Sequence, residues 1–357
     1  MTMLCVFPAF GFDRIGGIQE TARLAWEGLA QRATERGTAL ELLSVREGQP
    51  LSYTPASWRV LNASSKIRAV IGAGMTKWSS QSILVWHLGL LKLLPFLNLR
   101  DPRVAVFLHG IEAWRPLSYV TRRLLKRSEL LLCNSQYTWD RFIDVNPSLS
   151  SKSRVIVHLG LESVAQPVPM SCGTPAAVMI GRMVRSEDYK GHREVIGAWP
   201  LVSRRLPKAE LWIAGGGDMR NELERVAKQH GGEVHVRFLG CIDESSKEKL
   251  VSQCRCLVLP SRNEGFGLVY LEAMRLGRPC LVSTLDAGRE VVAPPEAGLA
   301  ADPDQPEQLA SALVRLMTPG QEWDRWSIQA RARYEKRFTA AHYQQRLLDA
   351  LQRISEH

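Results

Sequence analysis

Residues 259–280 read LPSRNEGFGLVYLEAMRLGRPC and contain one complete unit of an α/β fold. An apolar strand ends at Pro260, a turn with two glycines follows, and a helical stretch continues to about Gly277. A Gly-x-Pro sequence then opens the next apolar strand at Cys280. A strand, a crossover helix and a second strand form the repeating unit of a parallel sheet.

The same alternation of apolar strands and helical segments extends through the 357 residues in both directions. It lapses between 160 and 174, where two prolines, a serine and a glycine are typical of a linker. The expected strands are 4–8, 39–45, 83–86, 104–108, 130–133 and 155–158 before the linker, and 177–180, 210–214, 234–238, 256–259 and 280–283 after it. Residues 46–82 show no clear pattern.

The sequence therefore predicts an α/β fold with two Rossmann-like domains that face each other across a cleft. An N-terminal domain is expected over 1–165 and a C-terminal domain over 174–335. A C-terminal helix over 336–357 is expected to pack back on the first domain. Ligands of such sheets bind beyond the carboxyl ends of the strands.

The turn and helix of residues 259–280 carry two carboxylates eight residues apart, Glu264 and Glu272. At the rise of an α-helix this spacing separates them by about 12 Å, enough to reach the two ends of a nucleotide-sugar. Gly265 and Gly267 let a ligand approach the backbone closely. The alternative is an ordinary strand–turn–helix with two exposed glutamates, because this spacing alone is common.

The whole block resembles the nucleotide-sugar signature of glycosyltransferase family 4, which has the GT-B architecture. The resemblance implies that the N-terminal domain binds the acceptor and that the C-terminal domain binds the nucleotide-sugar. It also implies that Glu264 contacts the transferred sugar and that Glu272 binds the ribose hydroxyls. It also implies that the amides of Phe266, Gly267 and Leu268 face the sugar or the diphosphate. The chain departs from the family at 287–290, which reads AGRE where a Gly-Gly and a glutamate are usual, and at 159–160, which reads LG instead of Asn-Gly.

Two cations follow the first strand of the second half, Arg182 after Ile180-Gly181 and Lys190 in YKGH at 189–192. Cations at strand ends suit a diphosphate, and they stabilise the negative charge that grows as the bond from sugar to phosphate breaks. The pair resembles the phosphate clamp of the same family. Arg185 lies in the same loop and competes for the role of Arg182, and a pair of ordinary surface cations is the alternative.

Two glycine turns are further candidates for donor contacts. Gly16 and Gly17 open the first helix directly after the first strand, and in the family such a pair closes on the donor diphosphate. The spacing is not G-x-G-x-x-G, so it does not support NAD binding. The turn GGGD at 215–218 resembles the family's glycine turn, which places Gly215 and Asp218 near the nucleotide, although a plain loop explains it equally well.

A histidine follows the strand at 104–108 in the sequence HGIE. His109 therefore points toward the cleft, and the family resemblance places it near donor and acceptor. His87 ends the preceding strand and is a weaker candidate. Either histidine is alternatively a hydrogen-bonded structural residue.

No metal or cofactor is expected beyond the nucleotide-sugar, UDP- or GDP-linked, which is a substrate. DPD at 302–304 resembles an Asp-x-Asp metal motif, but capping of the helix that follows at Pro306 explains it better. The seven cysteines are irregularly spaced without a CxxC, which argues against a disulfide framework or a zinc site. Buried thiols of this kind indicate a cytoplasmic protein.

The net charge of +10 is concentrated in the first half. Residues 1–165 carry 20 Lys and Arg against 12 Asp and Glu, and residues 48–100 contain six basic residues and no acidic one. This asymmetry indicates an anionic partner, either a membrane surface or a lipid-linked substrate, although a solvated basic face is also common. No nucleic-acid-binding motif accompanies the charge. The apolar stretch Leu88–Arg100 is either an interfacial helix or a core helix.

The predicted function is a retaining, metal-independent glycosyltransferase that moves a hexose from a nucleotide-sugar to a saccharide or polyprenyl-diphosphate-linked acceptor. Family analogy suggests surface polysaccharide biosynthesis, with docking on the inner face of the cytoplasmic membrane. Two alternatives stay open. One is a nucleotide-sugar hydrolase or epimerase of the same architecture, and the other is a non-catalytic partner subunit.

Overall fold

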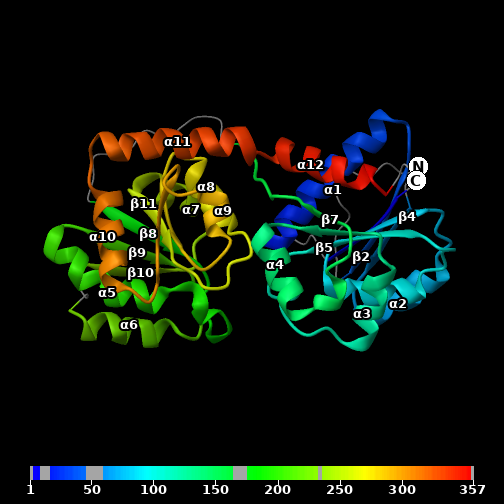
Figure 1. Cartoon of the computed structure of the whole chain (residues 1–357), viewed down its shortest axis with the longest axis horizontal. Coiled ribbons are helices and arrows are strands. Elements are labelled where there is room, and N and C mark those ends of the chain that lie inside the picture. Colours follow the sequence, from blue (N-terminus) through cyan, green and yellow to red (C-terminus); the bar gives the residue numbers. More distant parts are fainter. Residues whose placement is uncertain (1–2, 9–16, 46–58, 164–174, 232–234, 355–357) are drawn as a thin grey trace. The chain divides into compact units, whose positions relative to one another are not determined.

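The computed structural model describes residues 3–8, 17–45, 59–163, 175–231 and 235–354 (Figure 1). The chain divides into two compact units. The first comprises Met1–Leu161 together with Ala340–His357, and the second comprises Glu162–Thr339. The first unit ends at Leu161, where 165 was expected, and the second unit covers Glu162–Thr339, where 174–335 was expected.

The first unit contains a seven-stranded sheet in the order β3-β2-β1-β4-β5-β6-β7, with every pair parallel. The strands are β1 Met3–Pro8, β2 Leu40–Val45, β3 Arg59–Ala63, β4 Ser82–Val85, β5 Arg103–Leu108, β6 Leu130–Cys133 and β7 Arg154–Ile156. The helical segments are α1 Gly17–Glu35, α2 Lys66–Met75, η1 Leu88–Phe96, α3 Tyr119–Arg127, α4 Gln136–Val145, η2 Pro147–Leu149 and α12 Ala340–Gln352.

The second unit contains a six-stranded parallel sheet in the order β10-β9-β8-β11-β12-β13. The strands are β8 Ala176–Ile180, β9 Glu210–Ala214, β10 Val236–Gly240, β11 Cys256–Leu259, β12 Cys280–Ser283 and β13 Gly298–Ala301. The helical segments are η3 Arg185–Lys190, α5 His192–Arg205, α6 Arg220–Gln229, α7 Glu244–Gln253, α8 Leu268–Met274, α9 Gly288–Val292, α10 Pro306–Met317 and α11 Gln321–Arg337.

Both sheets have the doubly wound strand order of a Rossmann fold, so the predicted fold class is confirmed. Helices cover both faces of each sheet: α1 and α12 lie opposite α2 and α3 in the first unit, and α5 and α6 lie opposite α7 and α8 in the second (Figure 1). Strands buried on both faces read as continuous apolar runs, as in β6, β11 and β12, which made them visible in the sequence.

Helix α12 packs on α1 within the first unit. The hydroxyl of Tyr343 donates to the carbonyl of Thr21 at 3.0 Å, and Nε2 of Gln344 donates to the carbonyl of Leu24 at 2.9 Å. Gln344 also lies against Gly28, where a Cβ atom would come within 2.6 Å of its side chain. The C-terminal helix is thus a part of the first unit.

Within the stretch Leu88–Arg100, which was expected to be an interfacial or a core helix, Leu88–Phe96 forms a 3₁₀ helix, η1. Leu88, Leu91 and Leu93 are buried beneath the sheet, whereas Lys92 is exposed. Pro95 lies inside the segment and removes a backbone donor, which is incompatible with regular α-helical bonding. In the described part of the chain, no helix combines the length and the apolar character that crossing a membrane requires.

Candidate active site

The candidate site of the second unit lies where four strands end at the same edge of the sheet. Strands β9, β8, β11 and β12 are neighbours in that order. The loop after β9 carries Asp218, and the loop after β8 carries Arg182 and Lys190. Glu264 follows β11, and Asp286 follows β12. The strand order reverses between β8 and β11, so the crossovers on either side leave by opposite faces. This is the switch point at which doubly wound sheets bind ligands.

The loop after β8 brings two cations onto one carboxylate, that of Glu187. A guanidinium nitrogen of Arg182 contacts one oxygen of this carboxylate, and Nζ of Lys190 lies 2.7 Å from the other. The Arg182 side chain is 73% exposed, whereas Lys190 and Glu187 retain only 16% and 11% of their exposure. The predicted phosphate-binding cations are therefore brought together, and Lys190 is the one held in place by burial.

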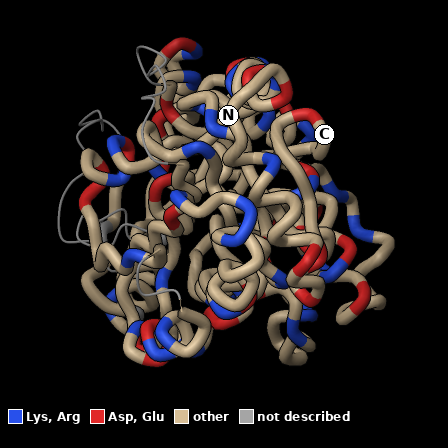
Figure 2. The backbone as a smooth tube through the Cα atoms, turned by 90° about the vertical axis from the view of Figure 1, so that its left-hand side faces the viewer, with Lys and Arg blue, Asp and Glu red and all other residues tan. Residues whose placement is uncertain are grey.

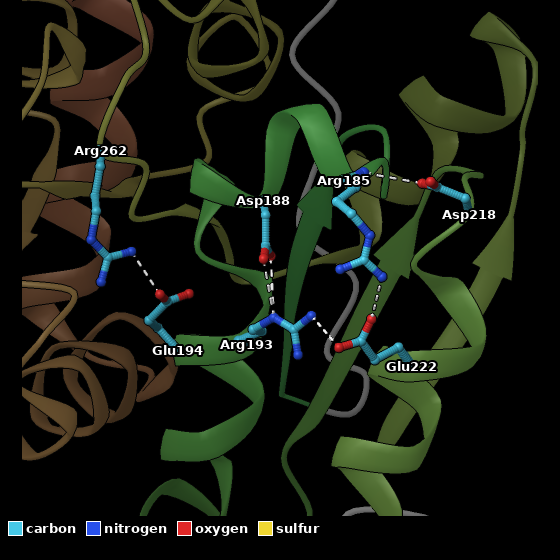
Figure 3. A network of polar contacts seen from close by, with 7 residues as sticks. All are labelled: Arg185, Asp188, Arg193, Glu194, Asp218, Glu222 and Arg262. Carbon is cyan, nitrogen blue, oxygen red and sulfur yellow. Dashed lines mark hydrogen bonds and ion pairs between the residues drawn. The ribbon is translucent and has the colours of Figure 1, made fainter.

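Arg185, the competing cation, is directed elsewhere (Figure 3). Its guanidinium lies 3.0 Å from Glu222, which also pairs with Arg193 at 2.6 Å. Arg193 in turn contacts Asp188 at 3.2 Å. This network ties η3 to α5 and α6, so Arg185 contributes to the support of the loop while Arg182 and Lys190 share Glu187.

Glu264 is half-buried in the loop between β11 and α8, within electrostatic reach of both Lys190 and Glu187. Burial raises the pKa of its carboxyl, the charge of Lys190 lowers the pKa, and that of Glu187 raises it; the net shift is upward. The amides of Gly265 and Phe266 donate to this carboxylate. In this structure the Phe266 amide is therefore satisfied within its own loop, and its contact with a donor stays a prediction.

Gly267 caps α8 in a left-handed conformation that suits only glycine. Its φ is +85°, and a Cβ atom there would lie 2.3 Å from the ring of Tyr270 and 3.2 Å from the Glu264 side chain. The helix that follows, with Leu268 as its first residue, ends at Met274 and not near Gly277. Glycine at this position therefore lets the backbone pass close to Tyr270 and Glu264.

Asp286, after β12, is a buried carboxylate that the sequence did not single out. Its Oδ2 accepts from the backbone amide of Glu264 at 3.3 Å, and its Oδ1 accepts from that of Gly288 at 2.9 Å. Burial raises its pKa to about 8, although the amide of Gly288 acts in the opposite direction. Because Asp286 bridges the loops after β11 and β12, it fixes the backbone that carries Glu264.

Glu272 lies within α8, and its partner Lys247 comes from α7. Nζ of Lys247 lies 2.8 Å from Oε1 of Glu272, and both side chains are largely buried, at 15% and 12% exposure. The other oxygen, Oε2, is buried and accepts no hydrogen bond from any described residue. The contact of Glu272 with a ribose therefore stays a prediction, for which this oxygen is an available acceptor.

The turn after β9 is shaped by close backbone approaches. A Cβ atom on Gly215, whose φ is +142°, would lie 1.9 Å from the carbonyl oxygen of Gly181. Asp218 accepts the backbone amide of Arg185 at 3.0 Å (Figure 3). The predicted pair Gly215 and Asp218 therefore packs against the loop that carries Arg182, and its role toward a nucleotide stays a prediction.

The segment 302–304 does not cap the helix that follows it, so that part of the sequence interpretation is wrong. The helix begins at Pro306, and Gln305 precedes it without a side-chain capping bond. Asp302 instead accepts the amide of Asp304 at 2.9 Å, and the Asp304 carboxylate pairs with Arg262 at 2.5 Å. In the described residues there is no group of three or more side chains suited to a metal ion.

In the first unit, His109 is buried at the end of β5. Its Nε2 lies 2.6 Å from the carbonyl of Trp86, and its ring stacks on Phe107 with centroids 4.5 Å apart. A carbonyl only accepts, so Nε2 carries the proton and Nδ1 is a hydrogen-bond acceptor. Burial lowers the pKa of His109 to about 4, which keeps the ring neutral near pH 7.

The other candidates of the first unit differ in what the structure describes. Gly17 is the first residue of α1, and Gly16 lies outside the described residues. The His87 side chain accepts the amide of Gly89 at 2.9 Å and caps η1. This capping bond supports a structural role for His87.

Comparison with known proteins agrees with this description. Residues 170–333 match the family model described as glycosyl transferases group 1. Over 141 residues the chain is 34% identical to an uncharacterized glycosyltransferase of Methanocaldococcus jannaschii, covering 40% of this chain and 35% of that protein. Over 136 residues it is 34% identical to the phosphatidyl-myo-inositol mannosyltransferase of Mycolicibacterium smegmatis, covering 38% and 34%. The chain thus spans about a third of the length of these curated relatives.

Solved structures match over nearly the whole of both chains. Anabaena Alr3699/HepE in complex with UDP and glucose superposes with a TM-score of 0.73 at 16% identity, covering 98% of this chain and 99% of that one. Sucrose-phosphate synthase of Thermosynechococcus elongatus gives 0.75 at 16% identity, with complete coverage of both. The chain therefore has the two-domain fold of these structures, and residues 170–333 resemble a domain of the glycosyl transferases group 1. The reaction of the whole chain, its substrates and its partners are proposals.

Proposed function

We propose that the protein is a retaining glycosyltransferase that moves a hexose from a UDP- or GDP-linked sugar to a saccharide or polyprenyl-diphosphate-linked acceptor. The observation that carries the proposal is the convergence of Arg182 and Lys190 beside Glu264 at the switch point of the second sheet. Glu272, with an acceptor oxygen that no described donor meets, supports a nucleoside end of the same ligand. Surface polysaccharide assembly is the pathway that we propose by analogy.

In the proposed reaction the bond between the sugar C1 and the diphosphate oxygen breaks, and its electron pair stays on the diphosphate. Arg182 and Lys190 stabilise the negative charge on the departing diphosphate, so this stabilisation does not require a metal ion. The acceptor oxygen bonds to C1 from the same face, and its proton passes to the departing diphosphate oxygen. Glu264 stabilises the positive charge that develops on the sugar ring and positions the ring, without forming a bond to it.

His109 fits the acceptor or sugar side of this reaction as a neutral group. Its Nδ1 is an acceptor because Nε2 donates to the carbonyl of Trp86, so Nδ1 would accept a hydrogen bond from a hydroxyl of the sugar. A cation is not required of it, since burial keeps its pKa at about 4. Gly16 and Gly17, at the start of α1, remain candidates for backbone contacts to the diphosphate.

The function is tested by incubating the protein with UDP- and GDP-hexoses and saccharide or polyprenyl-diphosphate-linked acceptors, and following release of nucleoside diphosphate. We expect release only when an acceptor is present, and an unchanged anomeric configuration in the product by NMR. Free hexose without acceptor would support the hydrolase, an altered donor sugar would support the epimerase, and an inverted product would exclude the retaining mechanism.

We further propose that the first unit docks on an anionic membrane surface. Basic and acidic residues are interspersed along most of the described chain (Figure 2), but from α2 to η1 the charged residues are basic. Three large apolar side chains follow one face of α2 at intervals of four: Ile67, Ile71 and Met75 are 74%, 55% and 81% exposed. Phe96, 48% exposed, adjoins the same helix near Gly74. An exposed apolar stripe with basic neighbours fits an interfacial contact with anionic lipid.

We expect the double variant Ile71→Gln, Met75→Gln to bind phosphatidylglycerol-containing vesicles at least about tenfold more weakly, because two apolar side chains no longer enter the interface. Co-sedimentation with vesicles measures this. The matched control is Ile328→Gln, on α11 of the second unit, which removes a side chain that is 70% exposed. Equal loss in the control, or equal binding of the wild type to neutral phosphatidylcholine vesicles, would contradict the proposal.

A further inference from the structure

Glu187 occupies the position between the two cations assigned to the donor diphosphate. Its two carboxylate oxygens are divided between them, one to Arg182 and one to Lys190. The residue has φ −123° and ψ 23°, a non-helical conformation inside η3 that turns the chain at this point. No sequence motif pointed to it, since it lies in the loop between the two recognised cations.

A carboxylate with this arrangement uses the same donors that a phosphate group would use. Guanidinium and ammonium groups bind carboxylate and phosphate oxygens with the same charge-assisted hydrogen bonds. With Glu187 ionised and in place, the three side chains carry a net charge of +1 rather than the +2 of the cations alone.

The neighbouring charges do not provide a substitute clamp. Arg185 and Arg193 are engaged by Glu222, and Arg262 lies 2.6 Å from Glu194 (Figure 3). A diphosphate that reaches the end of β8 therefore meets cations that are already paired with Glu187. The highly exposed Arg182 is the cation that can change partner at least cost, because its side chain retains 73% of its exposure.

We propose that Glu187 is an internal competitor for the donor diphosphate: it holds Arg182 and Lys190 in the free protein and must give up at least one of them when the donor binds. The inference rests on the proposed function and deepens it. The competition weakens binding of the donor, and it equally assists release of the nucleoside diphosphate after transfer. Glu187 is thus a positioning residue that adjusts affinity and does not touch the sugar.

The test compares binding of UDP, GDP, uridine and guanosine by calorimetry to the wild type, Glu187→Gln and Glu210→Gln. Glu210, at the opposite end of β9, is paired with Arg237 and 14% exposed, so its variant makes the same change of charge away from the site. We expect Glu187→Gln to bind whichever nucleoside diphosphate the wild type prefers about tenfold more tightly, with the nucleoside unchanged. The thermal midpoint of the free variant should fall, because Lys190 loses a buried counter-ion.

Competition predicts that Glu187→Gln binds the diphosphate more tightly and has a lower thermal midpoint. A purely structural role for Glu187 predicts that the variant has both a lower affinity and a lower midpoint. The inference is overturned if Glu187→Gln binds the diphosphate no more tightly than the wild type, or if Glu210→Gln tightens binding as much. Either result leaves the proposed function intact, provided that the wild type binds. If folded wild type and folded Glu187→Gln bind neither UDP nor GDP at millimolar concentration, the proposed function fails together with this inference.

Discussion

Replacing Lys190 by alanine should lower kcat/KM about a thousandfold, a loss of about 4 kcal/mol of transition-state stabilisation. Lys190 is the buried member of the cation pair, so its position is fixed before the donor arrives and costs little reorganisation during the reaction. Steady-state release of nucleoside diphosphate in the presence of acceptor measures the effect. Circular dichroism must show that the variant folds, because Glu187 would keep only Arg182 as a partner.

The matched control for this prediction is Arg185→Ala. Arg185 is a cation of the same loop, but it pairs with Glu222 at 3.0 Å and is 69% exposed. We expect less than about a threefold loss for it, as for most exposed pairs. If Arg185→Ala is as damaging as Lys190→Ala, or if Lys190→Ala retains the wild-type rate, the cation assignment is wrong.

Glu264→Gln should lower kcat by about a hundredfold or more while the dissociation constant of the donor changes by less than about threefold. Glutamine preserves size and hydrogen bonding but removes the charge that opposes the developing positive charge on the sugar. Rapid-quench turnover together with equilibrium binding separates the two quantities. Wild-type turnover in the variant would exclude Glu264 from the reaction centre.

The pH profile provides a second readout for Glu264. Burial holds the pKa of its carboxyl above the ordinary value for glutamate, and the ionised form is the active one. Activity should therefore decline as pH falls through that raised pKa, so the acid limb lies above the ordinary glutamate range. In Glu264→Gln this limb should disappear, and a profile that keeps it would assign the limb to another group.

The parts of the fold that the sequence predicted are those with a local signal. Strands such as β6, β11 and β12 are continuous apolar runs bounded by polar residues or proline, and their limits were predicted correctly. The second-sheet edge strand β13 was not predicted, because GLAA has small side chains and low strand propensity. Its packing explains the composition: a Cβ atom on Gly298 would lie 1.9 Å from the carbonyl oxygen of Cys280.

No clear prediction was possible for the segment 46–82, for a different reason. Strand β3 and helix α2 are both there, but α2 contains Gly72 and Gly74, and its apolar residues lie on an exposed face as well as a buried one. Neither propensity nor a single amphipathic face marks such a helix. Gly72 is needed because a Cβ atom there would come within 2.7 Å of Leu61.

In the candidate site, the sequence singled out residues that stand in recognisable motifs, but not the partners that these residues contact. Lys190 and Glu264 stand in short patterns, whereas Glu187, Lys247 and Asp286 carry no motif of their own. Asp286 meets Glu264 across 22 residues of sequence, and Lys247 meets Glu272 across 25. Contacts of this kind depend on which strands are neighbours, so only the strand order β8-β11-β12 reveals them.

The central claim, a nucleotide-sugar site in the second unit, is tested most directly by thermal shift with a panel of UDP- and GDP-sugars on the wild type and Glu272→Ala. A donor present at a hundred times its dissociation constant stabilises the folded protein by about 2.7 kcal/mol, which raises the midpoint of the wild type. We expect that one nucleotide-sugar raises this midpoint and that Glu272→Ala, folded but without its ribose contact, loses the effect. If no nucleotide-sugar stabilises the wild type at millimolar concentration, or if the variant responds as the wild type does, the claim is contradicted.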